Sequence, residues 1–345
     1  MRKTEHLYRL GQIFRAYRSK KTKGVPLPIR LWVEPNPYCN LKCPMCPQSE
    51  PRITEITKGK AYMDFELYKK IIDEAADHVY DINLAHRGES LFHKNLPAMI
   101  RYASEKGIKT RLHTNATIMN EKWSQNLLES GLDFLSFSFD GFKKEPYEKI
   151  RIGSNFEKTL TNILQFLRMK KERGAKKPYT VFQVIELDGN TQGKEEFIRQ
   201  FDDLPLDQLY IKKPHNWGGT IHSEVIDKQC HMDSYSHCSF LWYSLTILWD
   251  GHVTPCPQDF FSEYVLGDLR TQTIKEVWDG QPLVGLRDSL ARQEWQKIRP
   301  CNTCDRLWRK KVAGLPKINL RSFVSDNLVG YNFLNRFFRT RYEED

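Results

Sequence analysis

Long apolar runs are missing from this 345-residue chain. No stretch approaches the roughly 20 consecutive apolar residues that a membrane-spanning helix needs. The Arg/Lys-rich N-terminus also lacks the apolar segment and small-residue cleavage site of a secretory signal. Internal repeats and low-complexity tracts are absent from the sequence as well. These absences exclude a membrane-spanning helix and a repeat protein, and we expect a cytoplasmic location.

Acidic residues are fewer than basic ones. The chain has 43 Asp and Glu and 53 Lys and Arg, which gives a net charge of +10 and a pI near 9.1. The surplus suggests an anionic partner, such as a phosphorylated or nucleotide-linked substrate, nucleic acid or an acidic redox protein. Part of it can also offset the negative charge of thiolates that hold metal clusters. The hydrophobic content of 40% is ordinary for a globular protein with one large core and a small added module.

No thiol lies between residues 46 and 230, although the chain has eight cysteines. Three lie close together in the sequence at Cys39, Cys43 and Cys46. The other five follow residue 229, at Cys230, Cys238, Cys256, Cys301 and Cys304. Disulfides are rare in a reducing compartment, so two separate metal sites explain this distribution best. We predict that Cys230 is a spare thiol.

Strand-like and helix-like stretches alternate from about residue 28 to residue 215. We expect strands at 31–34, 79–85, 108–113, 134–139, 180–186 and 208–212, and helices at 63–78, 96–106, 120–130, 156–173 and 194–201. Such alternation implies βαβ crossovers and a parallel sheet. The region is too short for eight repeats, so the predicted fold is α/β, a partial (β/α)6 barrel with a small C-terminal α+β domain.

The C-terminal domain should contain a hairpin that turns at Asp250-Gly251, because Asp-Gly between apolar runs is a strong hairpin signal. The expected domains are a basic amphipathic helix at 1–27, the barrel at 28–215, a linker at 216–229, the C-terminal domain at 230–310 and a helical tail at 311–345. Reactive groups of such barrels gather at the carboxyl ends of the strands. Cys39 begins just past the first predicted strand.

The first three cysteines have the spacing Cys39-x3-Cys43-x2-Cys46. Thiolates are the usual ligands of iron–sulfur clusters, and a [4Fe–4S] cube normally takes four. Three on one loop would leave one iron without a protein ligand, and an open position is where a metal performs chemistry. A zinc knuckle or a chance trio is the alternative.

This spacing on this loop resembles the signature of the radical S-adenosylmethionine (SAM) superfamily. The resemblance implies that SAM chelates the open iron and is split into methionine and a 5′-deoxyadenosyl radical that takes hydrogen from a substrate. It implies SAM-binding roles for six residues: Met45, Gly88, Glu89, Asn115, Ser138 and Arg151. The family usually has an aromatic residue at 45 and glycines at 87 and 116, where this chain has Met, Arg and Ala. The alternative roles are strand ends that cap the next helix and, for Arg151, a surface ion pair.

Cys238, Cys256, Cys301 and Cys304 form a second set, with Gly251 between the first two. Four sulfurs suit structural zinc or an iron–sulfur cluster. Beside a radical SAM core, the spacing resembles the C-terminal SPASM region, and the absence of cysteine after Cys304 resembles its shortened "twitch" form with one auxiliary [4Fe–4S] cluster. Four thiolates leave no open iron, which implies a role in electron transfer.

The cysteine arrangement resembles aminocyclitol dehydrogenase-like twitch enzymes. The resemblance implies an oxidoreductase that dehydrogenates or epimerises an alcohol carbon of a sugar, cyclitol or similar small polar molecule, with flavodoxin or ferredoxin as electron donor. The first alternative is a SPASM-type peptide maturase, less favoured because only 38 residues precede Cys39. The second is a non-catalytic iron–sulfur electron carrier. We do not expect a nucleic-acid partner.

Candidate substrate-side groups close or follow the last barrel strand, at Lys212, Lys213, His215 and Asn216. A base near the reacting carbon would take the proton that a substrate radical loses. We predict catalytic roles for Lys213, His215 and Asp259. Asp259 could instead tune the auxiliary cluster, and a structural role is the alternative for each.

Both ends of the chain carry apolar stripes among basic residues. The N-terminal stripe comprises Leu7, Leu10, Ile13, Phe14 and Tyr17, and the C-terminal one Tyr331, Phe333, Leu334, Phe337 and Phe338. A basic amphipathic helix can make peripheral contact with an anionic membrane. We favour the other explanation, that the stripes pack over the ends of the barrel.

Overall fold

The structure is a computed structural model that describes residues 3–56, 61–187, 189–221 and 235–308, with the backbone at 311–312, 315–316 and 340–342. The strands are β1 (Arg30–Val33), β2 (Asp81–Asn83), β3 (Lys109–Thr114), β4 (Phe134–Ser138), β5 (Tyr179–Ile185), β6 (Gln208–Lys212), β7 (Ser244–Ile247), β8 (His252–Thr254), β9 (Gly267–Asp268), β10 (Lys311–Val312), β11 (Leu315–Pro316) and β12 (Thr340–Tyr342). The longer helices are α1 (Lys3–Arg18), α3 (Phe65–Ala75), α4 (Leu96–Glu105), α5 (Glu121–Glu129), α6 (Lys144–Ile150), α7 (Phe156–Glu172), α8 (Lys194–Arg199), α11 (Ile274–Asp279) and α12 (Gln281–Ala291). Short helices are α2 (Ile53–Ile56), α10 (Phe240–Tyr243), η1 (Pro47–Ser49), η2 (Ser90–Phe92), η3 (Cys301–Thr303) and η4 (Asp305–Leu307).

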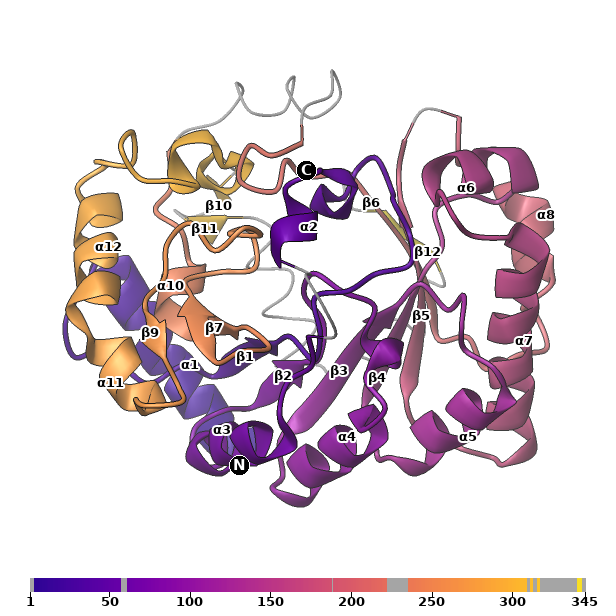
Figure 1. Ribbon diagram of the computed structural model, residues 1–345, viewed down its shortest axis with the longest axis horizontal. Helices are drawn as coiled ribbons and strands as arrows, with labels where there is room; N and C mark the ends of the chain where they lie inside the picture. The colour runs from indigo at the N-terminus through magenta and orange to yellow at the C-terminus, as the bar shows by residue number, and fades with distance from the viewer. Residues whose placement is uncertain are drawn as a thin grey trace.

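One curved, open sheet organises the molecule (Figure 1), with the strand order β12-β6-β5-β4-β3-β2-β1-β7-β8-β9. Strands β1 to β6 pair in parallel, which confirms the predicted partial barrel. Strand β7 pairs in parallel with β1, so the chain crosses from the β6 edge to the β1 edge before the C-terminal module begins. The predicted hairpin is present as the antiparallel pair β7–β8.

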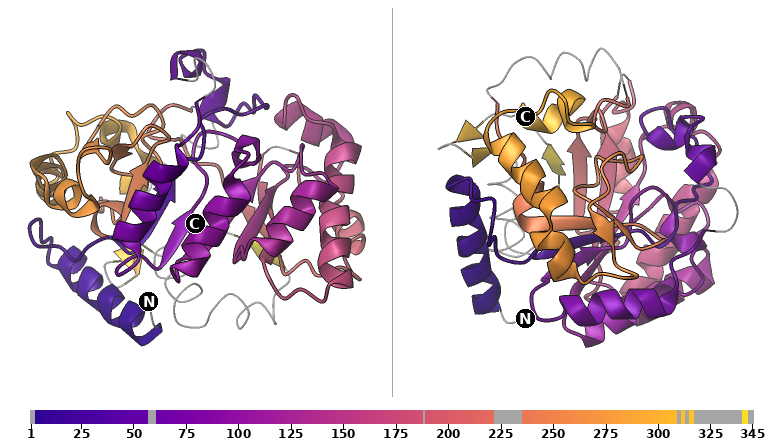
Figure 2. Two further views of the ribbon diagram at one scale, coloured as in Figure 1. Left: turned by 60° about the horizontal axis from the view of Figure 1, so that its bottom comes forward. Right: turned by 60° about the vertical axis from the view of Figure 1, so that its left-hand side comes forward.

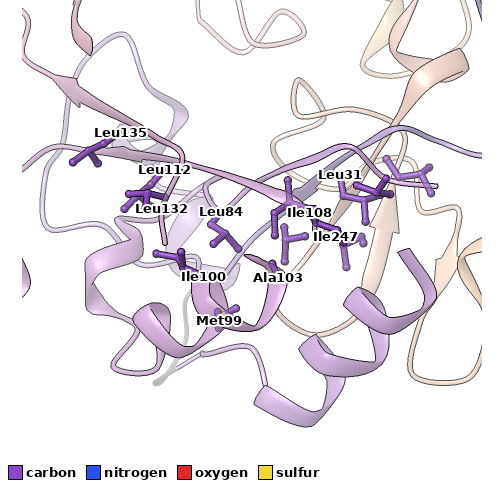
Figure 3. Close-up of a cluster of buried hydrophobic side chains, with 14 of the residues drawn as sticks. Leu31, Leu84, Met99, Ile100, Ala103, Ile108, Leu112, Leu132, Leu135 and Ile247 are labelled. Carbon is purple, nitrogen blue, oxygen red and sulfur yellow. The ribbon is translucent and has the colours of Figure 1, made fainter. Parts of the chain in front are cut away.

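The core lies between the outer face of this sheet and the helices. Figure 3 shows strand residues Leu31, Leu112 and Leu135 gathered with Met99 and Ile100 of α4. Because strand side chains alternate between faces, the intervening residues point into the barrel. Capping side chains fix where some helices begin. The Asp64 side chain accepts from two backbone N–H groups at the start of α3, and Thr273 forms a capping box at α11.

Helix α1 runs along the outside of the C-terminal module (Figure 2). Its Tyr17 hydroxyl donates to the His237 carbonyl at 3.0 Å, and Leu10 and Ile13 are buried. The N-terminal stripe therefore packs against the protein, as favoured, although Phe14 stays 41% exposed. The C-terminal stripe and Cys230 lie outside the described residues.

A helical tail was expected at 311–345. The backbone that the structure describes beyond residue 310 instead consists of the strands β10, β11 and β12. Strand β12 pairs in parallel with β6 and extends the barrel sheet. Among the described residues, no helix combines the length and apolarity that a bilayer crossing demands.

Candidate active site and auxiliary cluster site

The first three cysteines share one loop, directly after β1, at the carboxyl edge of the sheet. Cys39, Cys43 and Cys46 belong to one small apolar cluster with Leu41 and Met45. Burial raises the pKa of Cys39 and of Cys46 to about 12, and each lies close enough to Cys43 to be affected by its charge. Thiols of this kind lose their protons when they bind iron. The three cysteines therefore lie in one cluster beside the strand ends.

The loop is held from both sides. The buried Gln48 amide donates to the Pro37 and Arg87 carbonyls, each at 2.7 Å. Lys42 Nζ donates to the Gln48 carbonyl at 2.8 Å. Gln48 thus ties the segment after the cysteines to the segment before them and to the loop after β2.

Gly88 and Glu89 lie directly against the chain that leads into Cys39. The Glu89 N–H donates to the Tyr38 carbonyl at 2.8 Å, and a Cβ at Gly88 would lie 2.3 Å from the Asn36 carbonyl oxygen. The Glu89 carboxylate is buried and accepts from Leu91 N–H, Thr114 Oγ1 and Asn115 N–H at 2.7–3.1 Å. Burial raises its pKa. Glu89 therefore joins the β2 and β3 strand ends, with acceptor capacity left on Oε2.

Gly88→Ala is expected to displace the first cysteine loop, because the added methyl group would overlap backbone rather than a flexible side chain. Such overpacking typically costs about 1–3 kcal/mol. The free energy of unfolding and the iron content after anaerobic reconstitution measure the effect. Gly11→Ala in α1 is the matched control, since its Cβ meets nothing within 4 Å. Equal stability and iron content in both variants would count against the close approach.

Arg87, which stands where the family usually has glycine, is paired with Glu34 at the end of β1. Arg87 Nε and Nη2 each donate to one Glu34 carboxylate oxygen at 2.6 Å, and both side chains are almost fully buried. Burial alone would raise the pKa of Glu34, but Arg87 outweighs it and the pKa is lowered. His86 Nδ1 lies 3.4 Å from Glu34, and its Nε2 lies 3.2 Å from the carbonyl of Pro257, next to Cys256. The buried charge of Arg87, which replaces the family's glycine, is thus neutralised by its ion pair with Glu34.

Asn115 and Arg151 reach the first cysteine loop from other elements. The Asn115 amide donates to Asn40 Oδ1 at 3.0 Å and lies 3.8 Å from Cys39 Sγ. Arg151 Nη1 lies 3.9 Å from Cys43 Sγ, and its Nη2 pairs with Asp140 at 2.5 Å. Burial alone would lower the pKa of Arg151, but the Asp140 and Cys43 charges outweigh it and raise the pKa. This ion pair is buried and not on the surface.

The second cysteine set surrounds one cavity. Cys238, Cys256, Cys301 and Cys304 all line it, together with Pro255, Leu286, Leu290 and Pro300. Burial is the main cause that raises the pKa of Cys256 to about 12 and also raises that of Cys301 and Cys304. The described residues contain no three His, Cys, Asp or Glu side chains arranged to hold a single metal ion. Four thiols around a shared cavity fit a four-thiolate iron–sulfur cube.

The three predicted catalytic residues, Lys213, His215 and Asp259, have different surroundings in the structure. The buried Asp259 carboxylate accepts from Glu263 N–H and Tyr264 N–H at 2.8 and 2.9 Å, so it shapes its own loop. The His215 ring packs on Trp217 with ring centroids 4.5 Å apart. Lys213 directly follows β6 and is half-buried. Ser138 ends β4 opposite Gln183, also half-buried. The catalytic roles of Lys213, His215 and Asp259 therefore stay predictions.

The inner face of the barrel is polar and partly cationic. His113 and Ser136 alternate with Leu112 and Leu135, which face the helices. Burial, then the charges of Arg111 and of Lys212, lower the pKa of His113 to about 3. Arg111 also stacks over the Phe134 ring at 4.2 Å. The inner face of the sheet thus carries polar groups, and the Arg111 guanidinium there lies 3.9 Å from the Asp81 carboxylate.

Sequence reasoning missed several residues that hold these sites. Glu34 is an ordinary strand-end residue in the sequence, and only its partner Arg87, a departure from the motif, hinted at a compensating acid. Gln48 follows Cys46 by two positions but carries no recognisable signal. Trp217 was assigned to a linker, yet its indole N–H donates to the Met45 carbonyl within the first cysteine loop at 3.1 Å.

Comparison with known families agrees with this division. The family model of the radical SAM superfamily matches residues 33–211. The model of SPASM, an iron–sulfur cluster-binding domain, matches residues 238–305. The first match covers Cys39, Cys43 and Cys46, and the second covers the four cysteines around the cavity.

Individual relatives are distant. A tungsten-containing aldehyde ferredoxin oxidoreductase cofactor-modifying protein of Pyrococcus furiosus is 22% identical over 293 residues, which span 73% of this chain and 81% of that protein. The structure of BtrN in complex with AdoMet and 2-DOIA superposes with a TM-score of 0.54 at 21% identity, covering 81% of this chain and 94% of BtrN. Streptococcus suis SuiB bound to the precursor peptide SuiA gives a TM-score of 0.62 at 13% identity, covering 86% and 73%. These structural likenesses show the fold.

Proposed function

Since the chain belongs to the radical SAM superfamily, we propose that it oxidises or epimerises an alcohol carbon of a small polar molecule such as a sugar or cyclitol. It is a radical SAM enzyme with a SPASM domain, and these domains imply [4Fe–4S] clusters and SAM as cofactors. The single observation that carries the proposal is the cavity lined by four cysteines. A fully ligated cluster there suits electron transfer, which an oxidation requires.

When bound, SAM and the first cluster supply the hydrogen-abstracting 5′-deoxyadenosyl radical, and the second cluster supplies an acceptor for the electron left after the substrate loses a proton. In this proposal Cys39, Cys43 and Cys46 hold the first cluster. Glu89 would accept a hydrogen bond from the methionyl ammonium, and Asn115 and Arg151 would orient the cysteine loop. Met45, Gly88 and Ser138 complete the SAM site.

For the proton we propose Lys213, His215 or Asp259 as the accepting base, because a base near the reacting carbon assists loss of the proton. We propose a substrate that carries negative charge, such as a phosphorylated or nucleotide-linked sugar, because Lys and Arg exceed Asp and Glu by ten in the chain. Flavodoxin or ferredoxin is the proposed electron donor.

The test is anaerobic incubation of reconstituted protein with SAM, a reductant and a panel of phosphorylated sugars, nucleotide sugars and cyclitols. We expect one class to stimulate 5′-deoxyadenosine formation and to yield a carbonyl product or an epimer. Stimulation by a precursor peptide alone, with a modified peptide as the product, would instead assign the chain to the peptide maturases.

Cys256→Ala is expected to separate SAM cleavage from substrate oxidation. Loss of one of four ligands should remove the auxiliary cluster, so iron should fall from about eight to about four atoms per chain. 5′-Deoxyadenosine should still form while the oxidised product falls to background. Cys230→Ala is the matched control and should keep both iron and product, because we predict a spare thiol there. Unchanged product formation in Cys256→Ala would contradict the electron-acceptor role.

A further inference from the structure

The segment Asn216–Gly219, here called the junction segment, is bound tightly to the Cys301–Cys304 loop. Asn216 Nδ2 donates to the Thr303 carbonyl at 2.6 Å, and its Oδ1 accepts from Asp305 N–H at 3.2 Å. Thr303 Oγ1 donates to the Gly218 carbonyl at 2.6 Å. A Cβ at Gly219, where φ is +87°, would lie 2.2 Å from Thr303 Oγ1. The junction segment is therefore fixed on one loop of the auxiliary cluster site.

The same segment also contacts the Cys256 loop. A Cβ at Gly218 would lie 3.1 Å from the Gln258 carbonyl, so the two backbones approach closely. The Trp217 ring meets Phe260 edge-on, with centroids 5.6 Å apart. Two of the loops that supply thiols to the auxiliary cavity thus define where Trp217 lies.

From this fixed position Trp217 reaches the other cluster site. Its indole N–H donates at 3.1 Å to the carbonyl of Met45, the buried residue between Cys43 and Cys46. Trp217 holds a φ of +50°, a conformation that L-residues adopt only when their surroundings impose it. The junction segment therefore contacts three cysteine loops from distant parts of the sequence, and the Trp217 side chain itself contacts two of them.

We propose that Trp217 is a positioning residue that fixes the SAM-binding cysteine loop relative to the auxiliary cluster site through its hydrogen bond to Met45. The inference rests on the two cluster sites and not on the identity of the substrate. A buried carbonyl that loses its donor must find another partner or remain unsatisfied. Because Met45 lies between two of the cysteines, rearrangement of its carbonyl would alter the loop that presents the open iron to SAM.

The test compares Trp217→Phe with native protein, both reconstituted anaerobically. Phenylalanine keeps an aromatic ring but has no N–H group. We expect an unchanged iron content and a SAM dissociation constant raised roughly tenfold, the size of effect that an unsatisfied buried carbonyl produces. The second readout is the low-temperature EPR spectrum of the reduced protein, in which the SAM-dependent change should need correspondingly more SAM. Trp123→Phe on α5 is the matched control and should leave both readouts unchanged.

A ring of different size could disturb folding, so the second variant places β-(3-benzothienyl)alanine at position 217, which keeps the indole shape and replaces N–H by sulfur. It should reproduce the weaker SAM binding with full iron content. A SAM dissociation constant within twofold of native in this variant, or loss of its iron, would overturn the proposal. Neither readout involves a substrate, so failure of the proposed alcohol chemistry would leave this test unaffected.

Discussion

Replacing Cys39, Cys43 and Cys46 together by alanine should remove one cluster and leave the other. Iron should fall from about eight to about four atoms per chain, and 5′-deoxyadenosine formation should fall to background. The reason is geometric: the three thiols share one loop and one apolar cluster, whereas the other four line a separate cavity. Iron and sulfide analysis after anaerobic reconstitution, together with chromatography of the SAM products, measures both effects.

A second variant, in the other cysteine set, tests whether the two clusters are separate. Cys238, Cys301 and Cys304 replaced together by alanine should also lose about four iron atoms, yet should still cleave SAM. Loss of all iron from the first variant would show that the sites do not assemble independently. Full iron content in the first variant would exclude those three cysteines as ligands.

Arg87→Met should destabilise the folded protein by about 3–5 kcal/mol, the usual cost of removing one partner of a buried ion pair. Glu34 is fully buried, and Arg87 binds both of its oxygens at 2.6 Å. The variant leaves that carboxylate with the weaker contacts from His86, from the Trp249 N–H and from the backbone N–H of residue 87, at 3.3–3.4 Å. The free energy of unfolding in denaturant, followed anaerobically by tryptophan fluorescence, measures the loss.

Arg270→Met is the matched control, because Arg270 pairs with Asp268 through similarly short contacts but is 54% exposed. An exposed pair contributes about 1 kcal/mol or less. The double variant Glu34→Met with Arg87→Met should recover much of the stability, since it leaves no buried charge unpaired. Equal losses for Arg87→Met and Arg270→Met would contradict the account of the buried pair.

The Glu34–Arg87 pair should also make stability depend on pH. The folded-state pKa of Glu34 is lowered, so its contribution is fully present above the unfolded pKa of about 4.3 and is lost as pH falls below it. In Arg87→Met, the free energy of unfolding should therefore fall less steeply as the pH is lowered below this value.

The sequence by itself determined what depends on local pattern. Cysteine spacing assigned three thiols to one site and four to another, and both groupings hold in the structure. Apolar periodicity located β1 to β6 and the helices α3, α4, α5, α7 and α8 to within a few residues, because burial on one face repeats every two or 3.6 residues. The short helix α6 was not expected. Asp250-Gly251 identified the β7–β8 turn, because an Asp-Gly pair between apolar runs favours a tight hairpin turn.

Only the tertiary structure decided which distant segments meet. Pairing of β7 with β1, the addition of β12 beside β6, and the contacts of Trp217 with Met45 join residues far apart in the chain. No local period records such contacts, since they depend on how the sheet curves and where the chain crosses it. The pairing of Arg87 with the buried Glu34 was decided in the same way.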